Sequence, residues 1–132
     1  MSEQENLQLI QKLYEAFGRG DLPTILGSLT DDIDWHFFGP DEMPLGRRRR
    51  GRDEVTQFFA AIAQGQDVEA FAPEEFVVQE DKVVVVGRER MKVKRTGKAF
   101  ETAWVHIFDI RDGKIARFRG VSDTAAMMAA HS

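Results

Sequence analysis

Cysteine is absent from the 132 residues, which excludes disulfide bonds, thiolate nucleophiles, zinc ribbons and iron–sulfur ligation. There is no run of about 18 apolar residues that could span a bilayer, and the chain opens on polar and acidic residues rather than on a basic-then-apolar leader. We therefore expect a cytoplasmic protein with no membrane partner. The three histidines have no fixed spacing, and the glycines form no phosphate-cradling motif, so neither a metal nor a cofactor is expected.

What the chain does contain fits a single domain over residues 1–132. Hydrophobic residues make up 42% and charged residues 30% of the sequence, which are ordinary fractions for a globular protein. Ten Phe and two Trp supply bulk for a core. The net charge of −4 disfavours a dedicated nucleic-acid binder.

The spacing of apolar residues predicts three helices in the first half of the chain. The first carries Tyr14 and Phe17 on its apolar face and ends at Gly18. A second helix begins after Asp21, with a proline in its first turn. A third is expected over 52–63.

Strands dominate the second half. A short strand over 33–38 and a loop over 39–51 separate the second and third helices, and after residue 65 the hydrophobic period changes from 3.6 to 2. Four strands are then expected, at about 68–79, 82–95, 98–110 and 114–122, followed by a short helix. This order predicts an α+β fold, with three helices packed on one face of a curved antiparallel sheet.

The residues that fill these elements resemble a known superfamily over nearly the whole chain. The matching stretches are Leu13 to Phe17 with Gly20-Asp21-Leu22, Asp31 to Trp35, Gly51 to Val55 with Phe58-Phe59, Trp104 to Phe108, Asp112 to Ile115 and Asp123-Thr124. They look like the nuclear transport factor two-like superfamily, in its SnoaL-like and ketosteroid isomerase-like branch. The resemblance implies a cone-shaped, cystatin-like α+β roll that encloses an apolar pocket, commonly in a homodimer.

The catalytic residues of the related enzymes are only partly matched. The tyrosine that steroid isomerases carry on their first helix corresponds to Tyr14, but their general-base aspartate corresponds to Phe37 and their second aspartate lies near His106. The arginine and two aspartates of the epoxide hydrolases correspond to Gly87, Glu89 and Gly120, and the aspartate of the SnoaL-type cyclases also lies near Gly120. Each known catalytic set is therefore incomplete in this chain.

Strand register brings two ionisable groups onto an otherwise apolar face. If 96–97 is a two-residue hairpin loop, Glu89 lies opposite Trp104 and diagonal to His106. Burial would raise the pKa of the Glu89 carboxyl, whereas a neighbouring imidazolium would lower it. Such a pair could act as acid and base on a ligand. The alternatives are a structural hydrogen bond between the two side chains, or a glutamate at the solvated mouth of the cone.

The last hairpin decides whether arginines face the pocket. A two-residue loop at 112–113 would turn Arg117 and Arg119 inward, and an inward arginine would change the ligand class to anions. A three-residue loop at 111–113 turns Phe118 inward instead. We favour the second loop because it gives the cleaner apolar face.

The remaining pocket residues are expected to be aromatic. Tyr14 either packs in the core or directs its hydroxyl into the pocket, and His36 points away from it. The expected ligand-binding wall consists of Trp35, Phe37, Phe58, Phe59, Trp104, Phe108 and Phe118.

The run Arg47-Arg48-Arg49-Arg50 could bind phosphate or nucleic acid, or it could be a solvated loop. No aromatic residue interleaves the run, as stacking on single-stranded nucleic acid would require. We favour a loop at the pocket mouth that steers an acidic ligand.

Two hypotheses follow for function. The first is a cofactor-independent enzyme of the isomerase, cyclase or hydratase type, which acts on an apolar, ring- or carbonyl-bearing molecule with Glu89, His106 and Tyr14 as its catalytic residues. The second is a non-catalytic ligand-binding or dimerisation module in which the same groups are structural. They differ in whether Glu89 and His106 both line one cavity.

Overall fold

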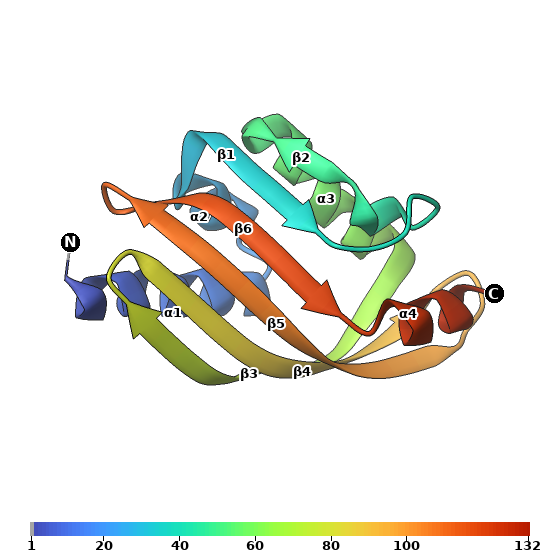
Figure 1. The fold of residues 1–132 in the computed structure, drawn as a ribbon. Coiled ribbons are helices and arrows are strands. Elements are labelled where there is room, and N and C mark those ends of the chain that lie inside the picture. The colour runs from blue at the N-terminus through green and yellow to red at the C-terminus, as the bar shows by residue number, and fades with distance from the viewer. Residues whose placement is uncertain (1) are drawn as a thin grey trace.

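The computed structural model describes residues 2–132 as one curved sheet with helices on its concave side (Figure 1). Its elements, in chain order, are α1 (Glu3–Gly18), α2 (Leu22–Gly27), β1 (Leu29–Phe37), a 3-10 turn (Pro44–Gly46), β2 (Arg48–Arg50), α3 (Gly51–Gly65), β3 (Gln66–Gln79), β4 (Lys82–Val93), β5 (Ala99–Arg111), β6 (Lys114–Ser122) and α4 (Thr124–His131). The predicted α+β class and the curved, open sheet are confirmed.

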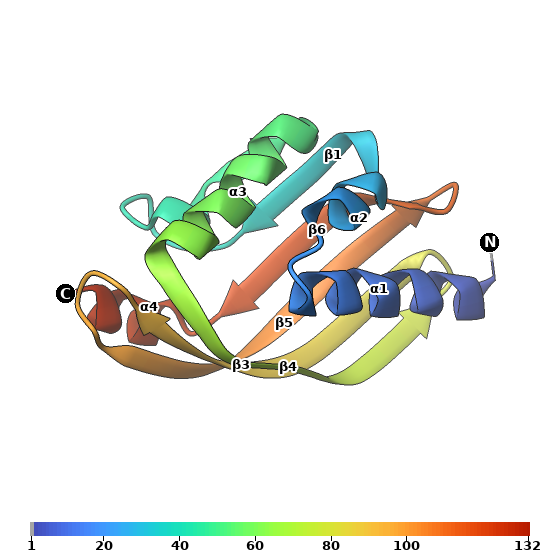
Figure 2. The same ribbon diagram turned by 180° about the vertical axis from the view of Figure 1, so that it is seen from behind.

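Side-chain caps start three of the helices. Ser2 and Glu5 form a reciprocal capping box at the start of α1. Asp21 accepts a hydrogen bond from the amide of the third residue of α2, and Asp123 does the same for α4. Seen from behind, α1, α2 and α3 cover the concave face of the sheet, while α4 lies at one end of it (Figure 2).

The sheet is mixed, not fully antiparallel as the sequence predicted. Its strand order is β2-β1-β6-β5-β4-β3, and β1 runs parallel to β6 while the other neighbours are antiparallel. The chain leaves β1, builds α3 and the β3–β5 meander, and returns beside β1 in the same direction. The loop expected over 39–51 also contains β2, which pairs with β1 through Arg48 and Arg50.

The hairpin between β4 and β5 has a longer turn than expected. The Val93 amide donates to the Lys98 carbonyl at 2.8 Å, so the connection is the four-residue turn 94–97, with Gly97 at φ +72°. Every pair is therefore displaced by two residues from the predicted register: Glu89 lies opposite Thr102, not Trp104. Because side chains alternate with period two, the residues predicted for each face remain on that face.

The last hairpin reaches the expected orientation by a different route. Its loop is the two-residue pair Asp112 and Gly113, both at positive φ, and not the three-residue loop that we favoured. A bulge before Arg117 then adds one residue to β6. Phe118 is consequently buried in the core, while Arg117 is exposed and Arg119 binds Asp109 on the outer face.

No helix within residues 2–132 is long and apolar enough to cross a membrane.

Candidate functional site

An apolar cavity lies between the helices and the concave face of the sheet. It encloses about 700 Å³ of space free of atoms, including its open mouth. Leu13, Phe17, Ile25, Trp35, Phe37, Leu45, Phe58, Phe59, Ile62, Phe71, Met91, Phe108, Phe118 and Met127 line it with apolar side chains, and Tyr14, Gln66, Glu89 and His106 are its polar residues. Six of the seven aromatic residues expected on the pocket wall therefore line it.

Trp104, the seventh, lies behind this wall. It is 1% exposed, and its indole ring stacks on His106 at 4.0 Å and on Phe71 at 4.9 Å between ring centroids. Gly87 makes room for it, because a Cβ there would lie 2.3 Å from Trp104 Cζ2 and 2.5 Å from the Ala72 carbonyl oxygen. Trp104 thus supports His106 from behind and does not face the cavity.

Tyr14 and His106 form the polar group on one side of the cavity. The Tyr14 hydroxyl lies 2.8 Å from His106 Nδ1, and the two rings are nearly parallel. Burial raises the pKa of the Tyr14 hydroxyl and lowers the pKa of the His106 imidazole to about 3, so both are neutral at pH 7.

A neutral Tyr14–His106 pair has one more hydrogen-bond donor than the bond between the two side chains uses. The pair holds one O–H and one ring N–H, and the bond between them uses only one. If Tyr14 donates to Nδ1, the His106 Nε2–H remains free. If Nδ1–H donates to the tyrosine oxygen, the Tyr14 O–H remains free. Either tautomer leaves one donor for an acceptor in the cavity.

Among residues 2–132, Glu89 is the only carboxylate that lines the cavity. Its side chain makes no hydrogen bond or ion pair with any of residues 2–132 that the structure describes, and it lies between Phe71 and Thr102 on the neighbouring strands. Burial raises the pKa of this carboxyl to about 7. It is therefore divided between its two protonation states near neutral pH, the condition under which a carboxyl serves best as acid or base.

Glu89 and His106 do not form the contact that the sequence predicted. The two-residue displacement of register places His106 opposite Val85. Since His106 is four residues along β5 from the partner of Glu89, the two are about 13 Å apart along the strands. The structural Glu–His hydrogen bond is absent for the same reason. Both side chains nevertheless line one cavity.

Gln66 is a polar lining residue that the sequence analysis missed. It is 7% exposed and begins β3 directly after α3. The expected strand began at residue 68, so Gln66 fell in a predicted turn. Gln66 lines the cavity only because β3 begins directly after α3, with no turn between them.

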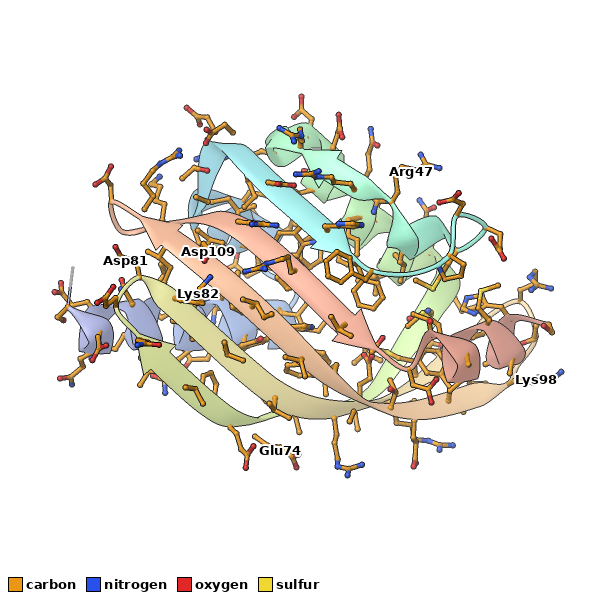
Figure 3. The ribbon with its side chains drawn as sticks, in the orientation of Figure 1. Arg47, Glu74, Asp81, Lys82, Lys98 and Asp109 are labelled. Carbon is orange, nitrogen blue, oxygen red and sulfur yellow. The ribbon has the colours of Figure 1, made fainter. Side chains whose placement is uncertain are left out.

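The arginine run is a paired edge strand and not a solvated loop. Arg48 binds Asp34 through two hydrogen bonds, at 2.9 and 2.5 Å. Arg49 is 6% exposed, with its guanidinium 5.3 Å from the ring centroid of Phe58. Arg47 is exposed at the end of the loop (Figure 3).

His36 lies on the sheet face opposite Trp35 and Phe37, and its ring meets Phe38 edge-on at 4.3 Å. Across residues 2–132, no three His, Asp or Glu side chains are grouped so that they could hold a metal ion.

The fold agrees with what comparison with known proteins finds. A family model described as a SnoaL-like domain matches residues 10–118. The chain belongs to the SnoaL-like family. A crystal structure of an NTF2-like protein from Burkholderia xenovorans LB400 is 33% identical to it, covers 100% of this chain and 99% of its own, and superposes with a TM-score of 0.90.

Two further relatives of this SnoaL-like protein are informative. TerC, crystallised with polyporic acid, is 30% identical, with coverage of 97% of this chain and 99% of its own and a TM-score of 0.83. An uncharacterized protein of Mycobacterium tuberculosis (strain ATCC 25618 / H37Rv) is 25% identical over 117 residues, which is 89% of this chain and 88% of the relative.

Proposed function

We propose that this SnoaL-like protein binds a small apolar molecule carrying a ring or a carbonyl group and moves a proton on it without a cofactor. The supporting observation is the pairing of two unlike polar groups in one apolar cavity. Glu89, which has no partner, can take up or release a proton at neutral pH. The Tyr14–His106 pair can donate a hydrogen bond while staying neutral.

The reaction that fits these groups is the removal of a proton next to a carbonyl. The Glu89 carboxylate takes the proton, and the electrons of the broken C–H bond form a carbon–carbon double bond while the carbonyl oxygen gains negative charge. The free donor of the Tyr14–His106 pair stabilises that oxygen. In a β,γ-unsaturated ketone the product is a dienolate, and return of the proton to its γ carbon completes an isomerisation that moves the double bond. Attack of the enolate carbon on a second carbonyl would instead complete a cyclisation.

The ligand class follows from the lining of the cavity. Fourteen of the eighteen lining residues are apolar, and eight of these are aromatic. Flat ring systems pack well against such walls. TerC, a relative at 30% identity, was crystallised with polyporic acid, so this compound is the first ligand to titrate.

Proton removal can be tested before the substrate is known. Ketones with exchangeable hydrogens, such as beta-tetralone and indanone, are incubated with the protein in D2O, and deuterium uptake is followed by NMR. We expect exchange that is faster with wild-type protein than with Glu89→Gln by about 10²-fold or more. Glu75→Gln, which changes an exposed glutamate, is the matched control and should behave as wild type.

Calorimetric titration of the same ketones and of polyporic acid separates the two hypotheses on function. Ketones that bind but exchange no faster than in buffer would contradict the catalytic role and leave a ligand-binding module. Exchange that is equally fast with Glu89→Gln would assign the base to another residue.

We also propose that the protein is a homodimer formed through the outer face of the sheet. Val84, Val86, Val105 and Ile107 are only half-buried there, and Val121 is 42% exposed. Ion pairs surround this apolar centre, among them Lys82 with Asp109, which Figure 3 shows from the outer side. An apolar centre with a charged rim is typical of protein interfaces.

Light scattering measures the mass directly. We expect about twice the 15.0 kDa of one chain at micromolar concentration, and the mass of a single chain for Val105→Lys. Val68→Lys is the control, because Val68 is 46% exposed and pairs with Met91 on the opposite face. A wild-type protein of one-chain mass would exclude the dimer.

A further inference from the structure

A second cavity adjoins the first at the end of the sheet where α4 lies. It is bounded by the end of α3, the start of β3, the end of β4, the loop after β1 and α4, and it encloses about 670 Å³ of atom-free space including its mouth. None of the proposed catalytic groups Tyr14, Glu89 and His106 lines it. We call it the outer cavity and the first one the inner cavity.

Three side chains stand between the two cavities. Leu45, Gln66 and Met127 line both of them, and each is at least nine-tenths buried. Met127 comes from α4 and has an unbranched side chain with several rotatable bonds, which changes shape at little cost. Met127 is therefore the part of this partition that can change shape most easily.

The charges at the two cavities differ. Of the residues that the structure describes, Glu89 is the only charged one that lines the inner cavity. Arg95 is the fixed charge of the outer cavity, which no carboxylate of residues 2–132 lines. Arg95 donates through Nη2 to the His131 carbonyl of α4, whereas its Nε and Nη1 make no hydrogen bond within residues 2–132.

The surroundings of Arg95 add to its positive charge. The turn 94–97 and the residue after it supply Lys94 and Lys98, and Figure 3 shows Lys98 at the α4 end of the molecule. Two contacts offset part of this charge: Asp67 lies 3.8 Å from the Lys94 amine, and the Lys98 amine donates to the Ser132 oxygen at 2.8 Å. Arg95 has no carboxylate partner among residues 2–132, so it leaves the mouth of the outer cavity positive, and an anion is the ligand group that this mouth favours.

We infer that the outer cavity binds the anionic group of a ligand whose apolar rings occupy the inner cavity. This rests on the proposed function and narrows its substrate class to an amphipathic acid, such as an aromatic carboxylate. Arg95 binds the anionic group through its free nitrogens, and Gln66 lies where the ligand passes from one cavity to the other. The anionic group fixes which end of the rings faces Glu89.

Two fluorescent probes with the same rings test this inference. Anilinonaphthalene sulfonate carries an anionic group, and N-phenylnaphthylamine lacks it. We expect Arg95→Gln to weaken binding of the sulfonate by about fivefold to twentyfold, and to leave binding of the uncharged probe within about twofold of wild type. Raising the salt concentration should weaken binding of the sulfonate to the wild-type protein and should have little effect on its binding to Arg95→Gln.

Arg88→Gln is the matched control, since it removes an exposed arginine of β4 that lies 3.8 Å from Glu74 and lines neither cavity. An equal loss of sulfonate binding with Arg88→Gln and Arg95→Gln, or no loss with either, would overturn the outer site. Binding of the uncharged probe to Arg95→Gln reports that the variant is folded. If wild-type protein binds neither probe, the proposed ligand cavity itself is wrong, and the outer site with it.

Discussion

Replacing Glu89 with Gln should make the protein more stable above pH 7. Glu89 has no partner among residues 2–132, and burial raises the pKa of its carboxyl from the ordinary 4.5 to about 7. The folded protein therefore holds the proton of Glu89 more tightly than the unfolded chain does. Glutamine keeps the shape of the side chain and has no charge to bury.

The sign and size follow from proton linkage. Between pH 4.5 and about 7 the folded state holds this proton and the unfolded state does not, so the Glu89 contribution to stability is present below pH 4.5 and is lost as the pH rises to about 7. At about 1.4 kcal/mol for each pH unit, the full loss is about 3 kcal/mol. Because the Glu89 side chain keeps partial exposure at the cavity, we expect Glu89→Gln to raise the free energy of unfolding above pH 7 by about 1–3 kcal/mol.

His106 acts in the opposite direction. Burial lowers the pKa of its imidazole from 6.5 to about 3, so its contribution to stability increases as the pH rises from about 3 to 6.5. In the wild-type protein the two groups offset each other between pH 4.5 and 6.5. In Glu89→Gln, the free energy of unfolding should therefore increase with pH in this range because of His106.

Urea unfolding followed by Trp fluorescence at pH values from 4 to 8 measures the difference. Glu89→Gln and wild type should have similar free energies of unfolding at pH 4 and should diverge in favour of the variant by pH 8. Glu75→Gln, at an exposed position, should follow the wild-type curve. Parallel curves for Glu89→Gln and wild type would show that Glu89 is not desolvated, and the account of its pKa would be wrong.

Three further substitutions test other parts of the structure. Tyr14→Phe removes the partner of His106 Nδ1 and should cost about 1–3 kcal/mol of stability in thermal unfolding, as well as slow any deuterium exchange. Gly87→Ala should cost about 1–3 kcal/mol or more in urea unfolding, because its methyl group would overlap an indole ring; Gly18→Ala, with open space around it, is the control. Arg49→Gln should lower the melting temperature measured by circular dichroism, since a buried guanidinium on an aromatic ring is lost. An unchanged melting temperature would favour the interpretation of the arginine run as a solvated loop.

The face on which each strand residue lies could be predicted even where its partners could not. The predicted loop at 96–97 gave the wrong register for Glu89, yet an error of two residues preserves the alternation of inward and outward side chains. The same holds for Arg117 and Arg119, where a bulge compensates for a loop that is shorter than expected. The period of the hydrophobic pattern thus predicts the sheet face of a strand residue more reliably than it predicts the residue paired with it on the next strand.

Arg49 and Gln66 show where sequence patterns were insufficient. Four consecutive arginines indicate an exposed segment, and nothing in the run distinguishes the one that is buried against Phe58. Gln66 lies in the cavity only because β3 continues directly from α3. In both cases the burial depends on an element that is distant in the sequence or on the direction in which the chain leaves a helix.

The sequence by itself determined the start of the second helix after Asp21, the curved α+β sheet and the aromatic character of the cavity, because these depend on residues within a few positions of each other or on a repeating period. Tertiary structure alone decided the parallel pairing of β1 with β6, the distance between Glu89 and His106, and the hydrogen bond that joins Tyr14 to a histidine 92 residues away. The pKa values of the site depend on the same long-range packing, because every side chain that covers an ionisable group contributes to its desolvation.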